Sequence, residues 1–227
     1  MSKSNQENGM TAAAAAPLYV QIPLHSDMSI HMACASLLEL KDTLYNCPEK
    51  SLIVTANINV HRNSRHGDGF ELGQAARRVM CTPNAGGRCL VSEVLSVELM
   101  DRLFGIQHLM TEMEIEYATL GPITDYACCI DKTKRTLGVS VTRAMAYQRR
   151  FTTQDAWRLV TKKTRGVVYS SASVVGCTFE RQILHIWVSS GADAAIVRRV
   201  CSKLPSYLKS NTIIFITTIN MDASFWK

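Results

Sequence analysis

The sequence predicts an α/β fold, and three observations lead to it. Between Ser92 and Ser170 the hydrophobic pattern gives the order helix, three strands, helix and strand, and such alternation is typical of layered α/β domains. The segment TIIFITTI at residues 212–219 is almost wholly apolar, which favours a buried strand within a sheet. Hydrophobic residues make up 47% of the chain and charged residues 19%, fractions typical of a packed globular protein.

The N-terminal part carries the looser patterns. Residues 1–16 are polar and then alanine-rich, and we expect a flexible tail there and no secretory signal. Residues 17–227 are then expected to form a single α/β domain. Its first part, an N-terminal α/β extension, is predicted to contain an extended segment at 18–22, a helix at 27–45, a strand at 51–60 and a helix at 69–80.

The elements from Ser92 onward rest on clearer patterns. Apolar residues recur at helical spacing from Ser92 to Phe104, and Gly105 follows as a helix end. Thr152 and Asp155 have the spacing of a capping box, so a second helix should begin there and end near Gly166. Alternating or apolar runs predict strands at 111–119, 123–130, 137–145 and 167–170, and then a C-terminal strand, helix and strand at 182–188, 192–204 and 212–219.

Charge and cysteine content narrow the function classes. The formal net charge of +6 permits a polyanionic partner without requiring one. The chain has eight cysteines, none at CxxC or zinc-finger spacing, so we expect mostly reduced core residues and a cytoplasmic or nuclear protein. No apolar run reaches the roughly 18 residues of a membrane span. The sequence also lacks a P-loop, a GxGxxG and a GxSxG motif.

Two carboxylates stand out as candidate site residues. Glu93 falls on the apolar face of its predicted helix, where a charge is costly unless it has a partner. It is therefore a candidate metal ligand or the partner of a basic side chain, or else a first-turn acid that favours the helix dipole. Asp125 lies in an otherwise uncharged strand, and aspartate is depleted in strands. We therefore interpret it as a functional residue, and the alternative is an aspartate at the strand edge that bonds a loop amide. Glu116, near the end of the preceding strand, could join an acidic cluster, whereas Glu112 and Glu114 are expected on a solvated face.

The third strand, LGVSVTRAM, carries Ser140 and Thr142 on one face and Arg143 on the other. A helix with Glu93, a strand with Asp125 and a strand with two polar residues one apart, followed by helix and strand, resembles the PD-(D/E)XK (restriction-endonuclease-like) superfamily. The resemblance covers about residues 92–175 and rests chiefly on the αβββαβ order of the elements.

This resemblance implies a metal-dependent phosphodiesterase site. Glu93 and Asp125 match the helical and strand acids of the family, with Glu116 as a third ligand for Mg²⁺ or Mn²⁺. Ser140 stands where the family has an acid, and Thr142 where it has the lysine that orients the attacking water. Two hydroxyls do not replace a carboxylate and an ammonium at full strength. The resemblance therefore implies a weak or inactive nuclease, with Lys132 or Lys134 as candidates for the missing lysine.

A basic stretch offers a surface for nucleic acid. Asp155 is the only acid between residues 132 and 165. Basic side chains at this density can track a phosphate backbone, or they can form a solvated face that neutralises nearby acids. The candidate contacts are Lys132, Lys134, Arg135, Arg143, Arg149, Arg150, Arg158, Lys162, Lys163 and Arg165.

The sequence thus leads to a nuclease-fold protein that binds DNA or RNA, with cleavage left open. The alternative is a non-catalytic scaffold that uses the same fold to bind a protein partner. His185, within QILHIWV, is expected in the core or at an interface rather than as a ligand.

Overall fold

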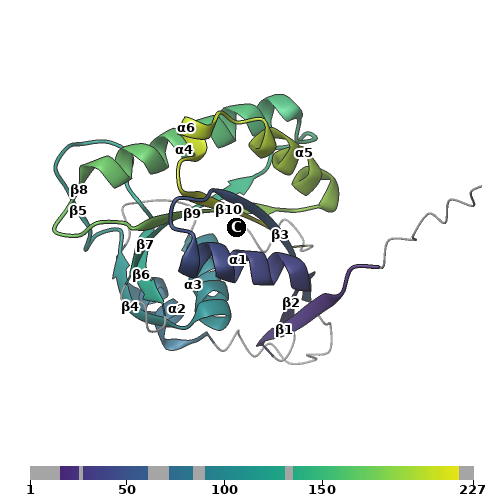
Figure 1. The fold of residues 1–227 in the computed structure, drawn as a ribbon, viewed down its shortest axis with the longest axis horizontal. Coiled ribbons are helices and arrows are strands. Elements are labelled where there is room, and N and C mark those ends of the chain that lie inside the picture. Colours follow the sequence, from purple (N-terminus) through teal and green to yellow (C-terminus); the bar gives the residue numbers. More distant parts are fainter. Residues whose placement is uncertain (1–15, 26–27, 61–71, 84–89, 131–134, 220–227) are drawn as a thin grey trace, which may run out of the picture.

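The chain folds around one eight-stranded mixed sheet (Figure 1). A computed structural model describes residues 16–25, 28–60, 72–83, 90–130 and 135–219. The predicted α/β class is confirmed, with six helices among the described residues. In Figure 1, α4, α5 and α6 lie above the central strands, and α1 and α3 lie below them, which gives a three-layer arrangement.

The N-terminal part supplies one edge of the sheet and three helices. Its elements are β1 (Tyr19–His25), β2 (Met28–Ala33), α1 (Cys34–Asn46), β3 (Leu52–Val60), α2 (Gln74–Cys81) and α3 (Leu90–Phe104). The remaining elements are β4 (Ile106–Thr111), β5 (Glu116–Tyr117), β6 (Tyr126–Ile130), β7 (Thr136–Ala144), α4 (Thr153–Ser173), β8 (Val174–Val175), β9 (Arg181–Val188), α5 (Gly191–Ser202), α6 (Ser206–Lys209) and β10 (Thr212–Ile219).

The strand order is β1-β2-β3-β10-β9-β7-β6-β4. The four central strands, β3, β10, β9 and β7, are parallel, and the strands at either end are antiparallel. Parallel strands are usually covered on both faces, and accordingly every residue of β9 is buried. β5 and β8 form a separate two-stranded ladder.

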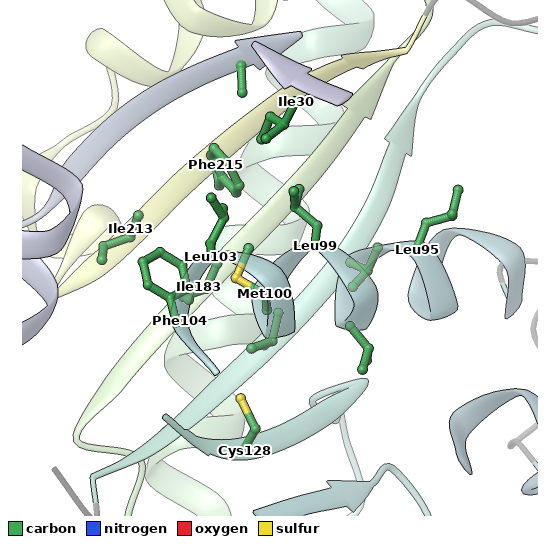
Figure 2. Packing of buried hydrophobic residues seen from close by; sticks show 14 of the residues in the cluster. Ile30, Leu95, Leu99, Met100, Leu103, Phe104, Cys128, Ile183, Ile213 and Phe215 are labelled. Atoms are coloured by element: carbon green, nitrogen blue, oxygen red, sulfur yellow. The ribbon is translucent and has the colours of Figure 1, made fainter. Parts of the chain in front are cut away.

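Two hydrophobic clusters fill the two faces of the sheet. Figure 2 shows the larger one, in which Leu99, Met100 and Phe104 of α3 face Ile183 of β9 and Phe215 of β10. On the opposite face, residues of α4 and α5 pack against alternate positions of β9 and β10. The period of two along each strand separates the faces.

Two buried polar side chains tie the layers together. His185 of β9 is fully buried, as expected of a core histidine, with ring nitrogens 2.8 Å from Ser96 Oγ and 2.9 Å from Thr217 Oγ1. Arg181, at the start of β9, donates hydrogen bonds to the backbone carbonyls of Thr43, Cys47, Lys50 and Asn211. It therefore holds the end of α1 against the beginnings of β3 and β10.

The helix predicted at 27–45 is wrong in its first part. Residues 28–33 form β2, which pairs with β1 on one side and β3 on the other, and the helix begins only at Cys34. Met28, Ile30 and Met32 are all buried, which is the period-two burial of a strand. Asp27, the proposed helix start, lies outside the described residues.

The strand predicted at 111–119 is also wrong. The strand in this region is β4, which ends at Thr111, and a turn follows. Glu114 stabilises that turn because its Oε2 accepts hydrogen bonds from the backbone N–H and the hydroxyl of Thr111. Only Glu116 and Tyr117 are extended, as β5.

The second helix is longer than predicted. It does not end at Gly166 but continues as α4 to Ser173, so the strand predicted at 167–170 is helical. Gly166 has a packing role instead, since a Cβ there would lie 3.2 Å from Pro122 Cβ. The parallel strand that follows α4 is β9.

Two further expectations concern the whole chain. The seven described cysteines form no disulfide with one another. None of the helices in the described ranges combines the length and apolar character that crossing a membrane requires.

Candidate functional site

The candidate site lies where the ladder between β6 and β7 ends. That ladder ends at the pair Tyr126 and Val139, so Asp125 lies directly before β6 rather than within it. Its Oδ2 accepts a 2.6 Å hydrogen bond from the backbone N–H of Val141. Lys163 of α4 donates a 3.2 Å hydrogen bond to the carbonyl of the same Val141. An acid and a base from different elements thus bind one residue of β7.

Glu93 joins this pair from the first turn of α3. Its side chain is buried, with a relative exposure of 6%. The pKa of Glu93 is raised to about 7, chiefly by burial and then by the charges of Asp125 and Glu112, while Lys163 acts in the opposite direction. The helical wheel predicted a carboxylate on a buried face, and the structure places it there.

Lys163 and Glu112 also act on the carboxyl group of Asp125. Burial raises the pKa of its carboxyl group, Lys163 and the Val141 N–H lower it, and Glu112 raises it. Three carboxyl groups and one ammonium group are therefore within electrostatic reach of one another. We name Glu93, Glu112, Asp125 and Lys163 the acid cluster.

The third acid of the cluster is not the one predicted. Glu116 is exposed on β5, where it pairs with Val175 of β8, and it is not among the charges that shift the pKa of Glu93 or Asp125. Glu112 takes part because the turn after β4 brings it close. The sequence showed alternating glutamates and gave no sign of that turn.

Ser140 and Thr142 lie on β7, and both are buried. Strand alternation puts them on the same face as Ala144, which packs in the cluster formed with α4 and α5. Lys163 approaches β7 from that helix layer.

The donor set suits a divalent cation only in part. Among the described residues, no group of three or more His, Cys, Asp or Glu side chains is arranged to hold a metal ion. Mg²⁺ is often held by only one or two carboxylates, with water and substrate phosphates as its other ligands. Glu93 and Asp125 match that smaller requirement.

Several of the arginines predicted to contact phosphate form ion pairs within the protein. Arg149 binds both carboxylate oxygens of Asp155, at 2.5 and 2.7 Å, and Arg158 binds it at 3.0 Å. The Arg149 bonds and the capping-box bonds of Thr152 hold the pKa of Asp155 well below its usual range. Arg135 pairs with Glu180 at 3.4 Å. Lys132 and Lys134 lie outside the described residues.

The outer face of α4 carries basic and aromatic side chains together. An open groove of about 640 Å³ runs along it. We name it the α4 groove, and it is lined by Pro122, Trp157, Arg158, Thr161, Lys162, Arg165, Gly166 and Tyr169. The predicted common face of Arg158, Lys162 and Arg165 is therefore confirmed.

Comparison with known proteins shows a similarity over part of the chain and assigns no family. The chain is similar to the AAC-rich mRNA clone AAC4 protein of Dictyostelium discoideum, with 39% identity over 155 residues. The match covers 65% of this chain and 22% of that protein, whose name states no activity. No protein-family model and no solved structure matches the chain.

Proposed function

We propose that this chain is a nuclease-fold protein that binds nucleic acid and carries a divalent-metal-dependent phosphodiesterase site of low activity. The observation that supports it is the meeting of Asp125 and Lys163 at Val141, beside the buried Glu93. An acid that binds metal and a lysine beside it are the groups that the PD-(D/E)XK resemblance requires.

The order of the elements around the site supports the same proposal. The consecutive elements α3, β4, β6, β7, α4 and β9 have the order αβββαβ once the short β5 and β8 are set aside. Their strands are neighbours in the order β4-β6-β7-β9, with β9 parallel to β7. Asp125 then precedes the second strand of this unit and Ser140 lies in the third.

Lys163 is the proposed replacement for the lysine that Thr142 does not provide. Its ammonium group contacts the β7 backbone one residue before Thr142. It also lowers the pKa of both Glu93 and Asp125, so it favours their ionised, ligand-competent forms. In the proposed site, Lys163 orients water and stabilises negative charge on the phosphate.

Glu93 and Asp125 would hold Mg²⁺ or Mn²⁺, with Glu112 close enough to add negative charge. When bound, the cation would stabilise charge on the phosphoryl oxygens and lower the pKa of a coordinated water. Three acids against one lysine leave a net negative charge, which fits a cation. Ser140, in the position of the family's second carboxylate, supplies no charge, which is the reason we expect low activity.

The α4 groove supports the nucleic-acid part of the proposal. Lys162 and Arg165 can contact phosphates, and Trp157 and Tyr169 offer surfaces on which bases stack. Within the described part of the chain no acid is paired with Lys162 or Arg165. Their charge is therefore available to a polyanion.

The test is thermal stability with and without Mg²⁺ or Mn²⁺, followed by hydrolysis of single- and double-stranded DNA and RNA. Asp125→Asn is the main variant because asparagine can still accept the Val141 hydrogen bond. Metal should raise the melting temperature of the wild type but not of Asp125→Asn. Glu112→Gln and Glu116→Gln form a matched pair, and only the first should weaken the metal response.

The degenerate positions Ser140 and Thr142 favour one alternative, a non-catalytic scaffold that binds a protein partner. On that alternative, neither the wild type nor Asp125→Asn responds to metal, and no substrate is cleaved. That joint result would replace the proposed function with the scaffold.

A further inference from the structure

A second cavity lies at the carboxyl ends of the parallel strands β7 and β9. It has a volume of about 590 Å³, within the range of small-molecule sites. We name it the arginine pocket. Its lining is Arg143, Ala144, Met145, Ala146, Arg149, Arg150, Phe151, Trp187, Val188, Ser189, Ser190, Ala192, Asp193 and Ile196. In open α/β sheets, the carboxyl ends of the strands are where ligands bind.

The pocket has a positive side formed by the end of β7 and the segment between β7 and α4. Arg143, Arg149 and Arg150 line it against a single acid, Asp193. That acid is already engaged, since its Oδ2 accepts hydrogen bonds from Ser189 and Ser190 at the start of α5. In the described structure no acid forms an ion pair with Arg150.

The local backbone fixes where these arginines lie. Gln148 has a φ of +55°, a left-handed conformation that turns the chain just before Arg149 and Arg150. Arg149 is then held by its two bonds to Asp155, which completes the capping box in the first turn of α4. The arginine side of the pocket is therefore anchored to the beginning of a long helix.

The rest of the lining is apolar. Phe151 and Ile196 are half-buried and belong to the cluster between the sheet, α4 and α5. Met145, Trp187, Val188 and three alanines complete this surface. A bare phosphate ion would occupy a small part of such a volume and leave the apolar surface in water. The lining instead fits a ligand that joins an anionic group to a flat apolar body.

We propose that the arginine pocket binds a nucleotide, with the phosphate at Arg150 and the base against Phe151 and Ile196. Arginine suits phosphate because its planar guanidinium donates two hydrogen bonds at once. The ligand is either a free mononucleotide or the terminal nucleotide of a strand. The inference deepens the proposed nucleic-acid binding and rests on it only for that second source, because the pocket shares no residue with the acid cluster.

The test measures binding by calorimetry in EDTA, with 5′-AMP, 5′-UMP and inorganic phosphate as probes. Arg150→Ala removes charge from the pocket, and Ala192→Trp fills it from the exposed first turn of α5. Arg198→Ala is the matched control, because it removes an exposed arginine of α5 that lines neither the pocket nor the α4 groove. A single-stranded oligonucleotide with a 5′-phosphate, and the same strand with a 5′-hydroxyl, distinguish a strand end from a free nucleotide.

We expect the nucleotides to bind at least about tenfold more tightly than phosphate, and Arg150→Ala to weaken them by about tenfold. Ala192→Trp should abolish binding, and Arg198→Ala should leave it unchanged. Competition by the 5′-phosphorylated strand alone would identify a strand end, and no competition by either strand would identify a free nucleotide. The proposal is overturned if no probe binds, if phosphate binds as tightly as the nucleotides, or if both pocket variants bind normally.

The same experiment separates the two proposals. Asp125→Asn should keep nucleotide binding in EDTA because the acid cluster lies outside the pocket. Retained nucleotide binding without any metal response would remove the phosphodiesterase site and leave the pocket. A metal response without nucleotide binding would support the phosphodiesterase site and overturn the proposal for the pocket.

Discussion

The backbone N–H of Val141 donates a 2.6 Å hydrogen bond to the carboxylate of Asp125, at the point where β6 no longer pairs with β7. The side chain thus takes the place of a strand partner. Asp125 is held by main chain on a buried strand, so the position of its carboxylate does not depend on a neighbouring side chain. Substitutions elsewhere in the acid cluster should therefore change its charge balance more than its geometry.

Glu93 should make the protein less stable as the pH rises. Its pKa is about 7 in the folded protein and near 4.5 when unfolded, so the folded state retains a proton that the unfolded state has lost between those values. Stability attributable to Glu93 is complete below about pH 4.5 and is lost as pH rises through about 7. Glu93→Gln should raise the free energy of unfolding near pH 8 by about 2 kcal/mol after screening is allowed for.

Urea unfolding of the wild type and Glu93→Gln at several pH values measures this effect. Glu116→Gln is the control, because Glu116 is exposed. A wild-type pH profile that matches that of Glu93→Gln would contradict the raised pKa.

His185 should have the opposite pH dependence. Burial lowers its pKa to about 3 from an ordinary value of 6.5, so the unfolded chain binds a proton that the folded protein excludes. The stability contributed by neutral His185 is present above about pH 6.5 and is lost progressively as pH falls towards 3. His185→Gln should flatten this acid limb by on the order of 3 kcal/mol between about pH 6.5 and pH 4.

The measurement is the slope of unfolding free energy against pH rather than stability at one pH. Loss of the hydrogen bonds to Ser96 and Thr217 lowers stability at every pH. If the free energy of unfolding of His185→Gln falls as steeply with decreasing pH as that of the wild type, other groups cause the acid dependence.

Lys163 should control the ionisation of the acid cluster. Its ammonium group lowers the pKa of Glu93 and of Asp125, so Lys163→Met should move the Glu93 titration above pH 7. Carbon-13 NMR of the glutamate carboxyl groups follows this directly. Lys162→Met is a matched control, because Lys162 lies next in sequence but faces the α4 groove. Equal effects of the two substitutions would exclude a specific role for Lys163.

The start of α4 should contribute measurably to stability. Thr152 and Asp155 form a reciprocal capping box there. Thr152→Ala should lower the free energy of unfolding by about 1 kcal/mol. Thr152→Ser should be nearly as stable as the wild type, because serine keeps the hydroxyl. Chemical denaturation checks both variants, and equal stability of the two would show that the hydroxyl is not needed.

The sequence predicted the elements whose pattern is local and strong. Thr152 and Asp155 marked the beginning of α4 because capping depends on residues three apart. The apolar runs that became β9 and β10 were recognised as strands because burial on both faces leaves few polar positions.

The failures occurred where partners distant in the sequence decide the structure. Residues 28–33 form a strand because β1 and β3 pair with both of its edges. The alternation of Met28, Ile30 and Met32 was the available signal, although the same residues also fit a helix. Gly166 was interpreted as a helix end, but its lack of a side chain serves the close approach of Pro122.

The sequence likewise indicated only part of the candidate site. Glu93 and Asp125 stood out because each is a charge among apolar residues, a signal that needs no tertiary information. Lys163 could not be distinguished from Lys162 or Arg165, because only the packing of α4 decides which basic residue faces β7. Glu112 depends on a turn that the alternating glutamates concealed.

The place of β10 in the sheet affects how the chain can fold during synthesis. β10 is the last described strand, yet it lies between β3 and β9 and is parallel to both. While a ribosome still holds that segment, the hairpin of β1 and β2 and its neighbour β3 have no link through the sheet to β9. Until β10 emerges, the strands made before it can form only two separate half-sheets, one from β1 to β3 and one from β4 to β9, and pairing with β10 then joins them.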